Sequence, residues 1–120
     1  MEDLRLGAVE TRFADIIWDN APLPSGELVR LCAEELGWKK STTYTVLKKL
    51  CERGIMQNQG GTVSALLTRD EYYARRGEQF VSETYGSLPA FIAAFTARNK
   101  LTEEEADAIQ KLIDGARREG

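Results

Sequence analysis

The sequence predicts a mainly α-helical fold with one small β-hairpin. Over most of the 120 residues, apolar side chains recur at the spacing of an amphipathic helix. Near the middle of the chain this spacing changes to alternation, on both sides of the pair Gly60-Gly61. Two glycines between short alternating runs are typical of the tight turn of a hairpin. We therefore expect three helices, the hairpin and three further helices, in that order.

The first two helices have clear ends in the sequence. Residues 8–19 carry the first helical pattern, and the proline-containing segment 20–24 ends it. The second pattern covers residues 25–36. Ser25 is expected to cap its N-terminus, and Gly37 to end it in the left-handed conformation that glycine adopts without strain.

The third helix covers residues 41–53 and follows after a short turn. Ser41 or a neighbour is expected to cap this helix, and Gly54 to end it. Two short helices joined by a tight, glycine-containing turn form a helix-turn-helix. The hairpin comes directly after them, so we assign residues 1–69 to a winged helix-turn-helix domain.

Residues 70–120 are predicted to form three more helices. The first covers residues 71–85, Ser87 opens the second, and a capping box of Thr102 and Glu105 opens the third. These helices carry more apolar side chains than a monomer covers, which favours a dimerisation region. The predicted dimerisation residues are Leu88, Phe91, Ile92, Phe95, Ile109, Leu112 and Ile113. The alternative is that they pack only on the winged helix of their own chain.

Charge is distributed unevenly along the chain. The total is −3, yet residues 38–76 carry eight basic and three acidic side chains, whereas both flanking segments are acidic. The local sign of the charge, rather than the net charge, decides where a polyanion docks. The basic segment contains the third helix.

A helical wheel divides the third helix into two faces. Thr43, Val46, Leu47 and Leu50 share the side expected to face the core. On the outer side, hydroxyls and a tyrosine suit base edges, and lysines suit phosphates or guanine. The predicted DNA-binding residues are Lys39, Lys40, Ser41, Thr42, Tyr44, Thr45, Lys48 and Lys49, with Gly60 at the tip of the wing. The alternatives are an ordinary solvated helix face and a wing that is only a turn.

Several function classes have little support. The chain has no histidine, and its two cysteines, Cys32 and Cys51, stand apart on apolar helix sides. We expect both to be small core residues, and we expect no metal site, no cofactor and no enzymatic activity. No apolar run approaches the length that spans a bilayer, and the acidic N-terminus has no signal-peptide core. A cytoplasmic protein without membrane insertion is expected.

Three groups of residues, in this order and spacing, resemble a known family. They are Leu6-x-x-x-Glu10 with Ile16-Ile17-Trp18-Asp19; Trp38-Lys39-x-Ser41-Thr42-x-x-Thr45-x-Leu47-x-Lys49-Leu50-x-x-x-Gly54; and Tyr85-Gly86-Ser87-Leu88 through Ala93-Ala94-Phe95 with Leu101-Thr102. Together they resemble the penicillinase and methicillin-resistance repressors and their copper-responsive relatives (BlaI/MecI/CopY type). The resemblance implies a bacterial transcriptional repressor that binds a palindromic operator as a homodimer. It also implies a membrane sensor protease as a partner.

Three features depart from the pattern of this family. Ala94-Phe95 replaces the Asn-Phe bond that is cleaved in the β-lactam-responsive relatives. The chain lacks the Cys-x-Cys pairs of the copper-responsive branch, so metal sensing is not expected. Ala65, Leu66 and Leu67 replace the aromatic and basic residues that usually follow the wing.

Two hypotheses follow from the sequence. In the first, a homodimeric repressor inserts residues 41–53 into the major groove of operator DNA. In the second, the winged helix is a protein–protein interaction module without specific DNA binding. Aliphatic or aromatic residues on the outer face of the third helix would favour the second hypothesis, and only Tyr44 is of this kind.

Overall fold

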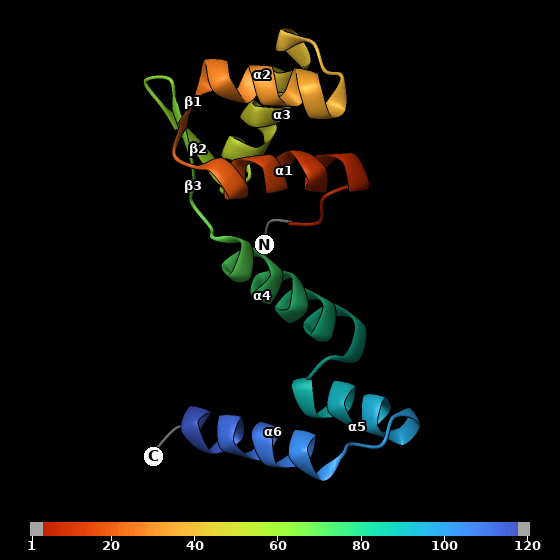
Figure 1. Ribbon diagram of the computed structural model, residues 1–120. Coiled ribbons are helices and arrows are strands. Elements are labelled where there is room, and N and C mark those ends of the chain that lie inside the picture. Colours follow the sequence, from red (N-terminus) through yellow and green to blue (C-terminus); the bar gives the residue numbers. More distant parts are fainter. Residues whose placement is uncertain (1–3, 118–120) are drawn as a thin grey trace. The chain divides into compact units, whose positions relative to one another are not determined.

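A computed structural model describes residues 4–117. Residues 1–3 of the expected winged-helix domain and residues 118–120 of the expected dimerisation region lie outside the described part. The chain divides into two compact units, Met1–Gln79 and Phe80–Gly120. Figure 1 traces the order of the elements along the chain.

Three helices make up most of the first unit. They are α1 (Ala8–Asn20), α2 (Ser25–Leu36) and α3 (Lys40–Glu52), and each bound lies within one residue of the predicted one. Gly37 has a φ of 68° and its N–H donates to the carbonyl of Ala33. The predicted left-handed end of the second helix is therefore confirmed.

A three-stranded antiparallel sheet completes the winged helix. Its strands are β1 (Leu23–Pro24), β2 (Met56–Gln59) and β3 (Thr62–Ala65), in the spatial order β1-β3-β2. The predicted hairpin is confirmed, and both glycines of its turn have positive φ, 59° and 91°. In Figure 1 this hairpin projects from one side of the three helices.

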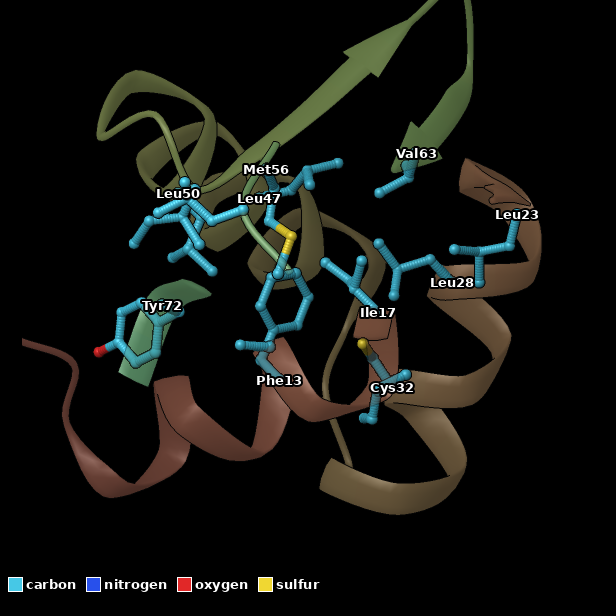
Figure 2. Close-up of a cluster of buried hydrophobic side chains, with 14 of the residues drawn as sticks. Phe13, Ile17, Leu23, Leu28, Cys32, Leu47, Leu50, Met56, Val63 and Tyr72 are labelled. Carbon is cyan, nitrogen blue, oxygen red and sulfur yellow. The ribbon is translucent and has the colours of Figure 1, made fainter. Parts of the chain in front are cut away.

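The core of the first unit lies between the helices and the sheet. Figure 2 shows side chains of all three helices and of β2 pointing toward one another, among them Phe13, Ile17, Leu28, Leu50 and Met56. The predicted core side of the third helix is confirmed, with Thr43, Leu47 and Leu50 buried and Val46 half-buried. This packing fixes which face of α3 points outward.

The predictions for serine caps differ from the structure. Ser25 is the first residue of α2, its N-cap is Pro24, and no side chain caps the helix. Ser41 lies within the first turn of α3, whose N-cap is Lys39, and again no side chain caps it. The Ser25 prediction is wrong because the Ser25 hydroxyl oxygen instead accepts a hydrogen bond from Tyr44.

The helix α4 (Arg69–Phe80) begins against the core of the first unit. Tyr72 is buried, and its hydroxyl donates to the backbone carbonyl of Leu4 over 2.7 Å. Trp18 donates its indole N–H to the carbonyl of Leu67, just before the helix, over 2.9 Å. The first compact unit therefore extends beyond residue 69, where the sequence placed the end of the winged helix.

Arg69 adds ion pairs at the same junction. Its guanidinium lies 2.8 Å from Asp19 Oδ1 and 3.2 Å from Asp15 Oδ1, and 5.5 Å from the centre of the Trp18 ring. The hydrogen bond that the Arg69 guanidinium donates to Asp19 is the main reason why the pKa of Arg69 is raised. This arginine is thus held by α1, and much of its charge is compensated within the fold.

The second unit contains the two predicted C-terminal helices, α5 (Leu88–Arg98) and α6 (Glu103–Ala116). Ser87 Oγ accepts from the N–H of Ala90, and Thr102 and Glu105 form the reciprocal capping box, so both predicted helix starts are confirmed. The predicted helix 71–85 has a different end, because Val81–Tyr85 is a π-helix, η1. None of the helices in the described part of the chain has the length and apolar character needed to cross a bilayer.

Candidate nucleic-acid interface

The outward face of α3 carries most of the predicted DNA-binding residues. The exposed ones are Lys39, Lys40, Ser41, Thr42, Thr45, Lys48 and Lys49. They are presented by a helix whose opposite face is buried, so their backbone positions are fixed by the core. Gly60 is also exposed and lies at the tip of the hairpin.

The four lysines of this face keep their charge available. Among the described residues, none of Lys39, Lys40, Lys48 and Lys49 forms an ion pair. By contrast, Arg30 pairs with Glu27 and Glu34 on α2, and Arg69 pairs with α1. Within the basic segment, the charge of Arg69 is therefore compensated by α1, whereas the lysines on and beside α3 have no such partner in the described part of the chain.

The hydroxyl groups of α3 are of two kinds. Thr45 Oγ1 donates to the carbonyl of Ser41 over 2.9 Å, so its proton is used within the helix while its exposed oxygen can still accept. Ser41 and Thr42 are exposed, and their hydroxyls have no partner among the described residues. These three residues can hydrogen-bond to base edges, and the threonines can also contact a thymine methyl group.

Tyr44 differs from the other predicted contact residues. It is half-buried, and its hydroxyl donates to Ser25 Oγ over 3.0 Å. Sequence reasoning placed Tyr44 on the outer face and had no signal for its bond to a residue at the start of the second helix. Ser25 is thus a residue of this region that the sequence did not indicate.

An open groove of about 520 Å³ runs between α3 and β2. Its lining residues are Tyr44, Leu47, Lys48, Cys51, Gln57 and Asn58. Gln57 donates to Ser64 Oγ, whereas the Asn58 side-chain oxygen accepts from the N–H of Gly61, so the amide N–H groups of Asn58 stay free to donate. Both groups that donate from the rim, Lys48 and Asn58, suit an anionic partner.

The two cysteines behave as expected for packing residues. Cys32 is buried and Cys51 is half-buried at the groove. Burial raises the pKa of both thiols, so both are protonated near neutral pH. Within the described residues no group of three histidine, cysteine, aspartate or glutamate side chains could hold a metal ion.

The second unit exposes most of the predicted dimerisation residues. Leu88, Ile92, Phe95, Ile109, Leu112 and Ile113 are exposed, Leu112 by 72%. Phe91 is half-buried, because it packs edge-on against Phe80 and Tyr85 at ring distances of 6.1 and 5.3 Å. No residue of α5 or α6 is buried. The two helices therefore present an apolar surface of the kind that interaction sites form.

Several motif residues have structural roles. Trp38 stacks on Phe13 at a ring distance of 5.3 Å and closes the core beside the turn before α3. Trp18 and Asp19 hold the start of α4, and Gly54 has a φ of 76° directly after α3. These residues fix the position of the exposed face rather than belong to it.

Comparison with known proteins identifies a family. The model of a family described as penicillinase repressor matches residues 6–115 of the chain. No curated protein matches the sequence significantly. The matched range includes the whole of α3, the hairpin and α5, and nearly all of α6.

Proposed function

Because the chain belongs to the penicillinase repressor family, whose members are DNA-binding transcription regulators, we propose that it is a homodimeric repressor of a palindromic operator. Each subunit inserts α3 into the major groove. The observation that carries this proposal is the outward face of α3, which presents exposed hydroxyl groups beside four lysines that form no ion pair with any residue between 4 and 117. Operator occupancy blocks access of RNA polymerase to the promoter.

The side chains of α3 divide the work of binding. Lys39, Lys40, Lys48 and Lys49 neutralise phosphates and supply the salt-dependent part of the affinity. The shorter residues Ser41, Thr42 and Thr45 lie between them on the exposed face and contact base edges. The backbone of Gly60 adds an uncharged contact from the wing.

A homodimer follows from the apolar surface of α5 and α6. Two chains related by a two-fold axis bury the same residues from each side, which a palindromic operator matches with two half-sites. The half-sites are then separated by about one helical turn of DNA, roughly 34 Å, or by a multiple of it. Because operator DNA lies in the bacterial cytoplasm, the proposed repressor acts there.

The release of the operator involves a membrane sensor protease in the β-lactam-responsive relatives. Here Ala94-Phe95 replaces the Asn-Phe bond of those relatives. A sensor protease that acts on this chain must therefore accept alanine before the scissile bond, or cleave elsewhere. An adjacent gene for a membrane protein with a zinc-protease HExxH motif would support this partner.

A binding titration tests the proposed function. A labelled duplex from the region upstream of the chain's own gene is titrated with the full-length protein, in parallel with a shuffled duplex of equal length. The proposal predicts tighter binding to the upstream duplex at moderate salt. Equal binding to both duplexes, with the dimer intact, favours the protein–protein interaction module instead.

A further inference from the structure

We propose that Tyr44 is a positioning residue that, together with Ser25, sets the recognition helix α3 against the wing, and that it does not read bases. This inference rests on the proposed DNA-binding function of α3. It concerns a hydrogen bond within the protein, between the third helix and the start of the second.

Ser25 lies where three parts of the winged helix meet. Its backbone N–H donates to the carbonyl of Gly61 in the wing turn over 2.8 Å. Its hydroxyl oxygen accepts from the Tyr44 hydroxyl over 3.0 Å, so the wing and α3 are joined through one residue. A Cβ atom added to Gly61 would lie 3.9 Å from Ser25 Oγ, in ordinary van der Waals contact with it.

The wing turn is itself held in place. Its Gly61 N–H donates to Asn58 Oδ1 over 3.1 Å, and the residues before Ser25 pair with β3, Leu23 opposite Val63 and Pro24 opposite Thr62. A connected set of hydrogen bonds thus runs from β2 through the turn and Ser25 to the middle of α3. The Tyr44 bond is the member of this set that joins it to the recognition helix.

The chemistry of Tyr44 argues against base reading. A tyrosine hydroxyl has a single proton, and here that proton is donated to Ser25. The ring is half-buried and packs against the core, and the hydroxyl could donate to a base only if its bond to Ser25 were broken. The exposed neighbours Thr42 and Thr45 need no such change.

Positioning matters because α3 and the wing must reach the DNA together. Lys48 lines the groove between them, opposite Asn58, so a rotation of α3 relative to β2 would change the position of its ammonium group. Groups that are held in the binding geometry before association avoid the cost of ordering during it. We expect the Tyr44–Ser25 bond to stabilise this geometry.

A double-mutant cycle tests the proposal. Full-length wild type, Tyr44→Phe, Ser25→Ala and the double variant are titrated with the upstream duplex and with a shuffled duplex. Each single variant is expected to bind the upstream duplex about three- to tenfold more weakly, the range for loss of one hydrogen bond. The double variant should be no weaker than the singles, because both remove the same bond.

Further measurements separate positioning from a general structural effect. The slope of affinity against salt should stay unchanged in all variants, since no phosphate contact is removed. The ratio of affinities for the upstream and shuffled duplexes should fall in Tyr44→Phe, Ser25→Ala and the double variant. Ser25→Thr keeps a hydroxyl, so it should restore the ratio that Ser25→Ala loses. The matched control is Tyr73→Phe, because Tyr73 is exposed and its hydroxyl has no partner among the described residues.

Three outcomes overturn the inference. If the losses of affinity caused by Tyr44→Phe and by Ser25→Ala add up in the double variant, the two residues act independently. A loss for Tyr44→Phe that depends on the identity of one base pair shows base reading. Wild-type affinity in both single variants shows that the bond has no part in binding. Equal binding of the wild type to both duplexes is a different result, which contradicts the proposed function itself.

Discussion

At the scale of single residues, arginines and lysines serve different purposes in this protein. Arg12 and Arg53 donate to the backbone carbonyls of Glu35 and Arg5, and Arg69 joins α1 to α4 through Asp15 and Asp19. The guanidinium group suits such forked contacts. The lysines of α3 stay outward as flexible point charges, the form in which they meet phosphates. Charge is therefore used both to hold the fold and to reach a partner.

A prediction at this scale concerns Tyr72. The change Tyr72→Phe removes the hydroxyl that donates to the carbonyl of Leu4 and leaves that acceptor unpaired in a buried place. We expect the free energy of unfolding to fall by about 1 to 2 kcal/mol, measured by urea denaturation. The neighbouring Tyr73→Phe, at a position that is 47% exposed, is the control and should change it little. Equal effects of the two changes would contradict this role of the Tyr72 hydroxyl.

At the scale of elements, the sequence predicted those with strong patterns. The helices, the hairpin with its glycine turn and the capping box of α6 follow from periodicity and from residues with special backbone or capping properties. The strand β1 was missed because two residues, one of them proline, carry no alternation, and the strand exists only through pairing with β3. Local patterns do not contain such long-range contacts.

In the candidate site, too, some features follow from a local sequence pattern and others depend on long-range contacts. The exposed and buried faces of α3 follow from its helical wheel, and the structure agrees with them. The bond between Tyr44 and Ser25 joins residues far apart in sequence, so no local pattern contains it. The first compact unit continues to Gln79, past the boundary expected at residue 69, and the buried Tyr72 of α4 belongs to its core through contacts that no local pattern contains.

A prediction at this scale compares two glycines. Gly77 lies inside α4 with ordinary helical φ and open space around it, so Gly77→Ala should raise the free energy of unfolding by about 0.5 to 1 kcal/mol. Gly37 ends α2 with a φ of 68°, so Gly37→Ala should lower it by about 1 to 2 kcal/mol. Thermal and urea unfolding measure both, and a change of the same sign in the two variants would contradict the assigned backbone conformations.

At the scale of the whole molecule, the proposed dimer accounts for the exposed apolar residues of α5 and α6. Their apolar residues are exposed in a single chain, and neither helix buries a residue. Association of two chains removes this apolar surface from water. In the proposed homodimer it would also join two winged helices into one DNA-binding molecule, which raises affinity for a site with two halves.

A prediction at this scale concerns dimerisation. Leu112→Glu places a charge on the apolar face of α6 at a position that is 72% exposed, so a single chain should tolerate it. We expect the dimer dissociation constant, measured by sedimentation equilibrium, to rise by about tenfold or more. The control is Lys111→Glu, on the opposite side of the same helix. A monomeric wild type at micromolar concentration, or an unchanged constant for Leu112→Glu, would contradict the assignment of this surface.

The most direct test of the central claim, that a dimer binds operator DNA through α3, is the salt dependence of binding. The affinity of wild type and of the Lys48→Ala/Lys49→Ala variant for the upstream duplex is measured across a range of salt concentrations. If both lysines of each subunit contact phosphates, the variant should bind more weakly, and its slope of log affinity against log salt should be shallower by about 3 to 4. An unchanged affinity together with an unchanged slope would contradict the proposed orientation of α3 on DNA.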